Sequence, residues 1–478
     1  MKIPRFMIAA PSSGSGKTLI TCGLLRLLTR RGLKISSFKC GPDFIDPMFH
    51  TKVLGTKSRN LDTFFTGDAV TRYLLEKNAA GTDLAVMEGV MGYFDGMGME
   101  SSRAGASDLA GVTDTPVILI IPAKGASRSL LAMIKGFLDF QEKKNIRGVI
   151  LNRVNAMIYP RLKAMIEDEL DVQVIGYVPP LTDCVLESRH LGLLMPDEIE
   201  SLQEKLDMLA DHLEKSIDVD GLLRLADEAP DLDEQNDRAA WEKLFSERAG
   251  RWQETAGRGG ERLRIGLAKD EAFCFFYEDN LQLLREMGAE LVEFSPIHDR
   301  QLPEKLDGLL LHGGYPELYC RELEANSSMR AAVRDAIEQG LPTMAECGGF
   351  LYLHDTLEDS DGKVWHMVGV LPEKSFYTGH LNRFGYMTLT EGSMFGVGPE
   401  EMGEIRSHEF HYYDSADPGN EYFAKKPVGN RSWRCIHAWH GTCELTAGFP
   451  HLYYHAAPGI PAAFLEQAGR YHRRTAGS

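Results

Sequence analysis

The stretch "IAAPSSGSGKTLI" (residues 8–20) joins an apolar run to an amphipathic one through a loop of glycine and serine. A glycine-rich turn between a strand and a helix can point several backbone N–H groups at phosphate oxygens, and the helix dipole adds to the attraction. In such a loop Lys17 is placed to reach the terminal phosphates of a nucleotide, and the hydroxyl of Thr18 to bind Mg²⁺. The pattern G-x-x-x-x-G-K-[ST] is met except that Pro11 stands at its first glycine. These residues predict a nucleotide-binding loop.

The first 195 residues continue the alternation that this loop begins. Strands are expected at six apolar runs, namely "RFMIAA", "LKISSFK", "DLAVMEGV", "PVILIIPA", "RGVILNRV" and "VQVIGYVP". Several amphipathic stretches between them have leucines at three- and four-residue spacing, which is typical of helices. Near-continuous apolar strands separated by helices indicate a parallel sheet that is covered on both faces. The predicted fold class is therefore α/β, with a doubly wound parallel sheet.

Composition changes along the chain indicate three parts. Residues 196–258 are expected to form a charged helical segment and an acidic linker that includes "ADEAPDLDEQNDRAA". A second α/β alternation then begins at "RLRIGLAKD". We expect a nucleotide-binding domain at 1–195, the linker at 196–258 and a second α/β domain at 259–478.

The overall composition excludes several protein classes. At 478 residues and 43% hydrophobic, the chain is long enough for two or three cores. Its net charge of −17 argues against broad binding to nucleic acid or to an anionic membrane. It has no run of about 20 apolar residues and no signal peptide at its start. Its eight cysteines form no CxxC pair and indicate reduced thiols, so we expect a cytoplasmic protein.

Charged residues follow two of the expected strands. Loops after the carboxyl ends of parallel strands converge on the ligand crevice of such a sheet. A single acid there is often a solvated loop residue, but a set points to a site for the metal and the γ-phosphate. The candidates, from "FKCGPDFIDP" and "VMEGVMGYFDG", are Lys39, Asp43, Asp46, Glu88 and Asp95.

One cysteine has the surroundings of a nucleophile. Cys347 in "TMAECGGFLYLH" follows a strand-like run and precedes a helical one, as in a nucleophile elbow whose helix N-terminus favours thiolate. The backbone N–H groups of Gly313, Gly314 and Gly348 are the expected oxyanion hole. Without this context, a buried structural thiol would be the better interpretation of Cys347.

The residues alone do not identify the base that a thiol needs. The histidines of three C-terminal motifs are equal candidates, namely His408, His411, His437, His440, His451 and His455. Two of them also lie in "CIHAWHGTC", where Cys435, His437, His440 and Cys443 have a spacing that could bind zinc. A reduced loop with incidental residues is the other interpretation of that stretch.

The motifs taken together resemble the cobyrinate a,c-diamide synthase family. "AAPSSGSGKT", "FKCGPDFIDPMFH", "NLDTFF", "MEGVMGYFDG", "ESRHLGL", "GGYPEL", "ECGGFLYL" and "HEFHYY" occur in the family's order and cover nearly the whole chain apart from the linker. The resemblance implies an ATP-dependent synthetase domain similar to dethiobiotin synthetase, followed by a class I glutamine amidotransferase domain. It also implies Mg²⁺ as cofactor, with ATP and glutamine as co-substrates.

The resemblance also implies roles for individual residues. The catalytic pair would be Cys347 and His451, since "TAGFPHLYYHAAP" matches the family's terminal histidine segment. ATP would be bound by Gly14, Ser15, Gly16, Lys17, Thr18, Lys39, Asn152 and Pro179. Substrate or intermediate would contact Asp43, Asp46 and Asp95, and the metal would be bound by Thr18, Asp43 and Glu88. Tyr453 stands where class I amidotransferases usually have a glutamate, which leaves open what orients His451.

The implied reaction is ATP- and glutamine-dependent amidation of the a and c acetate carboxylates of cobyrinate through an acyl phosphate. The same reaction on hydrogenobyrinate or nickel-sirohydrochlorin, and amidation like that of cobyric acid synthase, are alternatives. A non-enzymatic alternative is an ATP-binding scaffold with an inactive amidotransferase domain. The expected partners are small molecules (a corrinoid or related tetrapyrrole carboxylate, ATP and glutamine), without nucleic acid or membrane, and a homodimer is one arrangement that the sequence allows.

Overall fold

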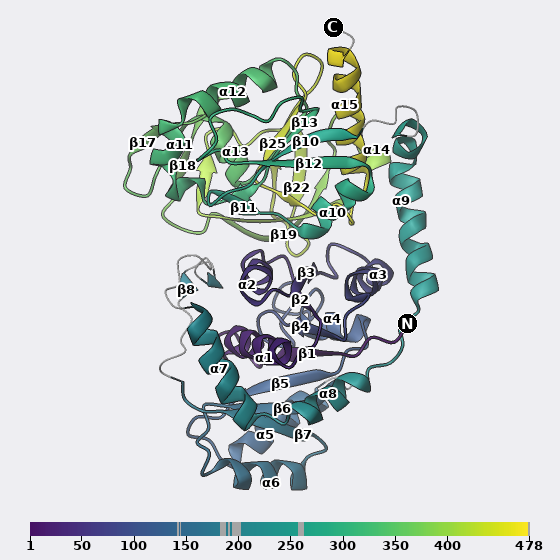
Figure 1. Ribbon diagram of the computed structural model, residues 1–478, viewed down its shortest axis with the longest axis vertical. Helices are drawn as coiled ribbons and strands as arrows, with labels where there is room; N and C mark the ends of the chain where they lie inside the picture. The colour runs from purple at the N-terminus through teal and green to yellow at the C-terminus, as the bar shows by residue number, and fades with distance from the viewer. Residues whose placement is uncertain are drawn as a thin grey trace. The chain divides into compact units, whose positions relative to one another are not determined.

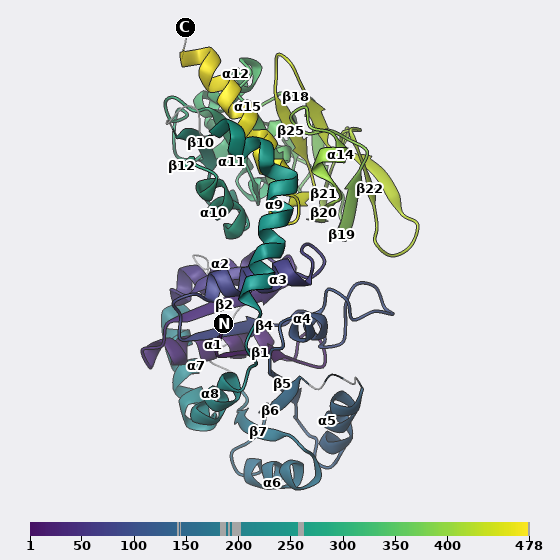
Figure 2. The same ribbon diagram turned by 90° about the vertical axis from the view of Figure 1, so that its right-hand side faces the viewer.

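The structure is a computed structural model that describes residues 1–140, 143, 145–181, 188–189, 192–193, 202–256 and 262–476. Three residues of the motif "ESRHLGL", namely Glu187, His190 and Leu191, lie outside these residues. The described chain divides into two compact units, Met1–Trp241 and Glu242–Ser478, which are drawn in Figures 1 and 2. The division falls within a helix, α9 (Glu234–Ala256), that includes much of the expected acidic linker. The domain limits 1–195, 196–258 and 259–478 stay a prediction.

The first unit is built on a seven-stranded parallel sheet in the order β3-β2-β4-β1-β5-β6-β7. Its strands are β1 (Arg5–Ala9), β2 (Ile35–Cys40), β3 (Lys57–Leu61), β4 (Leu84–Glu88), β5 (Val117–Pro122), β6 (Ile146–Asn152) and β7 (Gln173–Val178). Six of them confirm the predicted strands. The sequence analysis missed β3, because this edge strand reads "KSRNL" and lacks an apolar run.

Helices complete the first unit as the fold class predicts. They are α1 (Lys17–Arg30), α2 (Ile45–Leu54), α3 (Asp68–Ala79), α4 (Ala106–Val112), α5 (Ser129–Asp139), α6 (Tyr159–Glu169), α7 (Leu202–Ser216) and α8 (Val219–Asp227). Helix α7 runs beside α1 (Figure 1). A Cβ on Gly23 would lie 2.7 Å from Leu209 Cγ and 2.6 Å from Leu213 Cδ1. The charged segment after residue 196 therefore contributes a buried leucine face to the first core.

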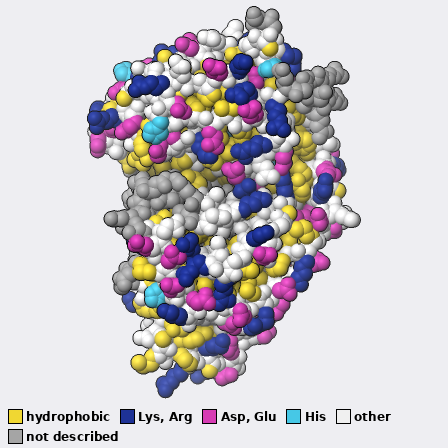
Figure 3. Space-filling model, in the orientation of Figure 1, with side chains coloured by type: hydrophobic (Ala, Val, Ile, Leu, Met, Phe, Trp, Pro, Cys, Tyr) yellow, Lys and Arg dark blue, Asp and Glu magenta, His cyan; other side chains and the backbone are white. Residues whose placement is uncertain are grey.

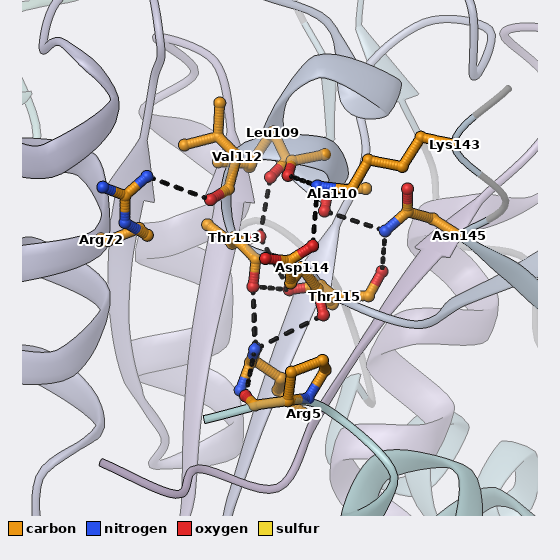
Figure 4. A network of polar contacts seen from close by, with 12 residues as sticks. Arg5, Arg72, Leu109, Ala110, Val112, Thr113, Asp114, Thr115, Lys143 and Asn145 are labelled. Atoms are coloured by element: carbon orange, nitrogen blue, oxygen red, sulfur yellow. Dashed lines mark hydrogen bonds and ion pairs between the residues drawn. The ribbon is translucent and has the colours of Figure 1, made fainter. Parts of the chain in front are cut away.

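A buried arginine ties the start of β1 to distant segments. Arg5 has no exposed surface, and burial lowers its pKa to about 10. Its guanidinium donates to the backbone carbonyl of Thr113 from Nε at 3.1 Å and Nη2 at 2.9 Å, and to those of Ile3 at 3.0 Å and Pro230 at 2.8 Å. Figure 4 shows the Thr113 end of this network. The contacts join β1 to the loops that follow α4 and α8.

The second unit contains a six-stranded sheet in the order β12-β10-β13-β15-β25-β24. Five strands are parallel, namely β10 (Leu263–Ala268), β12 (Ala289–Phe294), β13 (Gly308–Leu311), β15 (Thr343–Glu346) and β25 (Leu445–Gly448), whereas β24 (His437–Trp439) is antiparallel. The described helices of this unit include α10 (Glu278–Glu286), α11 (Cys320–Ala325), α12 (Ser327–Glu338), α13 (Gly348–Leu353), α14 (Pro399–Met402) and α15 (Gly459–Ala476). This confirms the second α/β alternation.

Smaller sheets complete the second unit and were not predicted. A five-stranded sheet contains β23 (Ser432–Cys435), β22 (Tyr422–Lys425), β19 (Arg383–Thr390), β20 (Ile405–His411) and β26 (His451–Leu452). A four-stranded sheet contains β17 (Val364–His366), β16 (His354–Glu358), β18 (Leu371–Tyr377) and β21 (Tyr413–Ser415). A two-stranded ladder pairs β11 (Phe273–Phe275) with β14 (Gly313–Gly314). Figure 2 shows β18 to β22 beside the helix-flanked part of the same unit.

The surface carries both signs of charge. On the face drawn in Figure 3, basic and acidic side chains are interspersed over each unit, so the net charge of −17 does not form one acidic field there. None of the described helices is long and apolar enough to cross a bilayer.

The buried guanidinium predicts a local stability effect. Arg5→Lys should lower the free energy of unfolding around β1 by about 3 kcal/mol, because one ammonium cannot reach all the carbonyls that the guanidinium satisfies. Hydrogen exchange with mass spectrometry should show faster exchange of the β1 and β5 peptides and unchanged β10 to β15 peptides. Arg128→Lys is the control, because that side chain is 83% exposed. Equal protection of β1 in both variants would contradict this role of Arg5.

Candidate active site

A cavity of about 560 Å³ lies at the nucleotide-binding loop of the first unit. Its walls include Gly14, Gly16, Lys17 and Thr18, which lie between the end of β1 and the first turn of α1. Lys17 Nζ donates to the backbone carbonyls of Ser12, at 3.1 Å, and of Met91. The loop thus curls around its own lysine, as phosphate-binding loops do.

Two further predicted ATP contacts line the same cavity. Asn152 ends β6, and Pro179 follows β7. Asn152 Nδ2 donates to the Ser15 carbonyl at 2.8 Å, and a Cβ on Gly16 would lie only 2.7 Å from that nitrogen. Gly16 also has φ of 93°, which a residue with a side chain rarely adopts. The loop conformation and the place of Asn152 therefore depend on each other.

The predicted charged residues meet beside this loop. Lys39 Nζ lies 2.5 Å from Asp46 Oδ2 and 2.9 Å from Glu88 Oε1, and all three side chains are buried. The Thr18 hydroxyl donates to the same Glu88 oxygen at 2.6 Å. Glu88, at the end of β4, thus contacts both Lys39 on β2 and Thr18 in the first turn of α1.

Burial and neighbouring charges set the ionisation of this cluster. Burial acts to lower the pKa of Lys39, but Asp46 and Glu88 hold it well above its ordinary value. Burial would raise the pKa of Asp46, yet Lys39 and His50 keep it below its usual range, whereas burial raises the pKa of Glu88. Burial and the charge of Asp46 raise the pKa of Asp43 to about 7. One acid in this set is therefore close to half-protonated at neutral pH.

The two remaining predicted acids are less enclosed. Asp43 is half-buried and accepts the backbone N–H of Ile45, the first residue of α2, at 2.8 Å. Asp95 is exposed and accepts the backbone N–H of Gly92 at 3.0 Å. Its charge acts to raise the pKa of Lys17, against the effect of burial. Both can move toward a ligand at lower cost than the buried acids.

In the second unit, Cys347 lies at a sharp turn between β15 and α13. Its φ is 47° and its ψ is −103°, an unusual backbone for a residue with a side chain, and its N–H donates to the Gly448 carbonyl at 2.8 Å. This is the strained strand-to-helix turn expected of a nucleophile elbow. The expectation of a thiolate is wrong for this structure, because burial and the charges of Glu317 and Glu409 raise the pKa of Cys347. Helix α13, with six residues, does not outweigh them.

The glycines near the cysteine also bring a histidine to it. A Cβ on Gly313 would lie 2.6 Å from His451 Cε1 and 3.6 Å from Cys347 Cβ, so both residues contact the same glycine. A Cβ on Gly348 would lie 2.9 Å from the Gly314 nitrogen. The three glycines expected to form an oxyanion hole thus gather at the turn that holds Cys347.

The other candidate histidines have different surroundings. His408 is the strand partner of His451 across β20 and β26, with ring centroids 6.3 Å apart, and His411 stacks on Phe449 at 3.9 Å. His437 Nε2 lies 2.9 Å from the Asp417 carbonyl. These contacts favour His451 as the neighbour of Cys347.

The stretch "CIHAWHGTC", whose spacing could bind zinc, does not form a metal site in the described structure. Cys435 ends β23, His437 begins β24 after the left-handed residue Ile436, and His440 Nδ1 lies 3.3 Å from Glu444 Oε2. Within the described parts of the chain, no group of three or more His, Cys, Asp or Glu residues has the arrangement of a metal site.

Three residues that matter here were not selected from the sequence, namely Glu346, His312 and His50. His312 Nδ1 and His451 Nδ1 each lie 3.7 Å from Glu346 Oε2, and all three side chains are buried. Glu346 is part of the motif "TMAECGGFLYLH", which is notable for its cysteine, and His312 directly precedes Gly313. In the first unit, His50 Nε2 lies 3.6 Å from Glu88 Oε2. The signal that could have found them is their position, since each sits beside a predicted site residue.

Comparisons with known proteins follow the division into two units. Residues 6–193 match the model of the CobQ/CobB/MinD/ParA nucleotide binding domain, and residues 264–456 match the CobB/CobQ-like glutamine amidotransferase domain. A cobyrinate a,c-diamide synthase of Salmonella typhimurium is 39% identical over 97% of this chain and 98% of its own. That of Caldanaerobacter subterraneus is 36% identical over 98% of this chain and 99% of its own.

The chain belongs to the cobyrinate a,c-diamide synthase family. The resemblance seen in the sequence motifs is thereby confirmed. Among solved structures, a glutamine amidotransferase covers 43% of this chain and 98% of its own at 17% identity and a TM-score of 0.29. The MinD cell division protein of Aquifex aeolicus covers 46% of this chain and 94% of its own, at 15% identity and a TM-score of 0.27. The family also fits the α/β fold of both units.

The lowered pKa of Lys17 predicts a pH dependence of ATP binding. Burial and the charge of Lys39 lower the pKa of Lys17 to about 8. As the pH rises through that value the side chain loses its charge and attracts phosphate less, so the Kd for ATP should rise by up to about tenfold per pH unit. Titration calorimetry between pH 7.5 and 9.5 measures this. Lys17→Arg stays charged and should flatten the rise, whereas a flat wild-type profile would contradict the assignment.

Proposed function

We propose that this chain uses ATP and glutamine to amidate the a and c acetate carboxylates of cobyrinate, a step in cobalamin biosynthesis. One observation carries the proposal: a single polypeptide holds both a phosphate-binding loop beside a buried Lys39–Glu88 pair and a Cys347 next to His451. The relatives of matching length that are named cobyrinate a,c-diamide synthase support the choice of substrate.

The amidotransferase unit would release ammonia from glutamine. The Cys347 sulfur attacks the side-chain carboxamide carbon while His451 takes the thiol proton, and the negative charge that develops on the oxygen faces the glycine N–H groups. His451 then gives the proton to the leaving nitrogen, ammonia departs, and water hydrolyses the thioester to glutamate. The high thiol pKa is consistent with a proton that leaves only once glutamine is bound.

The synthetase unit would make a carboxylate reactive toward that ammonia. A carboxylate has no adequate leaving group, so one of its oxygens attacks the γ-phosphorus of ATP, ADP departs and an acyl phosphate forms. Ammonia then attacks the carbonyl carbon and phosphate leaves with the former carboxylate oxygen. Lys17 and Lys39 would offset the negative charge of the transferred group, and Asn152 and Pro179 would bind the adenine end. The four residues line the same cavity, which supports these roles. Asp43, Asp46 and Asp95 would contact substrate or intermediate.

The residues beside the phosphate-binding loop also fit a magnesium ion. Mg²⁺ usually takes one or two protein ligands and completes its shell with phosphate and water. The Thr18 hydroxyl and the Glu88 carboxylate lie together, and Glu88 Oε2 is buried without a hydrogen-bond partner. We therefore propose Thr18 and Glu88 as its protein contacts, with Asp43 as a further one. When bound, the ion would neutralise phosphate charge.

The cysteine provides the first test of the proposal. Cys347→Ala should abolish amidation with glutamine, because no thioester can form, yet keep amidation when an ammonium salt replaces glutamine. Cys320→Ala is the matched control, since it removes another buried thiol of the same unit. Product masses after incubation with ATP and Mg²⁺ measure both reactions. A Cys347→Ala variant that still uses glutamine would contradict the role of the thiol.

The substrate is tested with the wild-type chain. Cobyrinate, hydrogenobyrinate and nickel-sirohydrochlorin are offered in parallel, and two amide substitutions on cobyrinate at the highest rate are expected. Preference for another ring would replace the proposed substrate, and four substitutions would indicate a reaction like that of cobyric acid synthase. Absence of glutamate release and of any amide product would favour a scaffold role instead.

A further inference from the structure

A carboxylate lies directly beside the proposed base of the amidotransferase unit. Glu346 Oε2 is 3.7 Å from His451 Nδ1 and 3.7 Å from His312 Nδ1. Exposure of the three side chains is 5% for the glutamate, 3% for His451 and 2% for His312. One carboxylate thus faces two imidazoles in a site that excludes water.

The fold fixes this arrangement through three separate backbone segments. Glu346 ends β15, His451 begins β26, and His312 directly follows β13. Strand β15 lies between β13 and β25, which precedes β26, so the carboxyl edge of the sheet brings the three side chains together. Glu346 also immediately precedes Cys347, so its backbone is set by the same turn as the nucleophile.

The charge state of the glutamate fits this contact. A buried carboxylate is costly unless a donor or a positive charge faces it. Burial alone would raise the pKa of Glu346, but the neighbouring imidazoles of His312 and His451 hold that pKa below the ordinary value. The carboxylate is therefore ionised at neutral pH and can accept a proton-bearing nitrogen from each ring.

The position that carries the orienting acid in class I amidotransferases is used differently in this chain. Tyr453, two residues after His451, donates its hydroxyl to Asp279 Oδ2 at 3.1 Å and packs edge-to-face on Tyr277. It is held by the α10 region, and its hydroxyl cannot serve as an anionic partner for an imidazolium.

We propose that Glu346 is the positioning residue of His451, and that His312 holds Glu346 in place. The inference rests on the proposed glutaminase function. Glu346 would keep the proton on His451 Nδ1, so that the lone pair of Nε2 is free to take the thiol proton from Cys347. When that proton arrives, the carboxylate stabilises the imidazolium until the proton passes to the departing ammonia. Glu346 itself neither gains nor loses a proton.

Other ionisable groups also lie near His451. His408 lies across the β20–β26 pair, and burial lowers its pKa well below the ordinary value, so it is neutral there. Cys347 shares Gly313 with His451, and the charges of Glu317 and Glu409 act on that thiol. Of these groups, Glu346 is the one in contact distance of His451 Nδ1.

The test compares two variants that each remove a carboxylate from a histidine. Glu346→Gln should lower kcat for glutamate release by up to about 10⁴-fold, by analogy with loss of the acid from a Ser-His-Asp triad, and leave the KM for glutamine within about twofold. Asp307→Asn is the matched control, because Asp307 pairs with His472 at 2.8 Å at the opposite end of β13. The control should keep kcat within about twofold.

The pH profile separates positioning from a merely structural role. Without the carboxylate the imidazolium is less stable, so the acid limb of kcat/KM should move to lower pH by about one unit. Glu346→Asp keeps the charge at a shorter reach, so it should recover part of kcat and the wild-type limb. Turnover driven by ammonium salts reports on the synthetase unit and shows that it is intact in each variant, and a thermal melt of each variant shows whether the amidotransferase unit is folded.

The outcomes are distinct. An unchanged kcat and acid limb in Glu346→Gln, or an equal loss in Asp307→Asn, would overturn the role of Glu346 while glutaminase activity in the wild type stands. If Glu346→Gln does not fold, Glu346→Asp decides, because an unchanged kcat there would overturn the proposal and an intermediate kcat with the wild-type limb would support it. A wild-type chain that releases no glutamate refutes the proposed function, and this inference with it.

Discussion

Burial of the Lys39 ammonium between two carboxylates is the interaction that holds the first site together. It joins β2 to α2 through Asp46 and to β4 through Glu88, at 2.5 Å and 2.9 Å. Glu88 in turn accepts the hydroxyl of Thr18, which begins α1 next to the phosphate loop. Removing one member of such a buried set leaves an uncompensated charge that costs about 3–5 kcal/mol. The elements that surround the loop are therefore fixed by charges that also suit phosphoryl transfer.

The second unit also buries a charge that neighbouring groups compensate, but the groups are different. There the buried charge is the carboxylate of Glu346, and two imidazoles compensate it. Gly313 leaves room for His451 to approach Cys347, because any side chain at that position would overlap the ring. In both units the reactive groups follow the carboxyl ends of parallel strands, where side chains from separate segments converge. The two halves of the proposed reaction thus rely on one architectural rule.

The sequence predicts this architecture well where local patterns determine it. Six apolar strands, the phosphate loop and the elbow at Cys347 each have a local signature, and the carboxyl-edge rule brings Lys39, Asp46 and Glu88 together. The strand β3 was missed because its residues are polar, and α9 lies in a stretch that looked like a linker because it is acidic with few large apolar side chains. Contacts between segments that are far apart in the sequence could not be predicted from local patterns. The choice of His451 among six histidines and the partner role of Glu346 depend on the pairing of β26 with β20 and on the order of β13, β15 and β25 in the sheet, which no local pattern encodes.

The central claim is that the buried cluster of Lys39, Asp46 and Glu88 serves the transfer of phosphate to a ring carboxylate. The most direct measurement uses cobyrinate whose carboxylates carry ¹⁸O, with ATP, Mg²⁺ and glutamine, and mass spectrometry of the released phosphate. An acyl-phosphate intermediate predicts one ¹⁸O atom in inorganic phosphate for each amide formed. Amide formation with unlabelled phosphate, or with the label in AMP, would contradict the account.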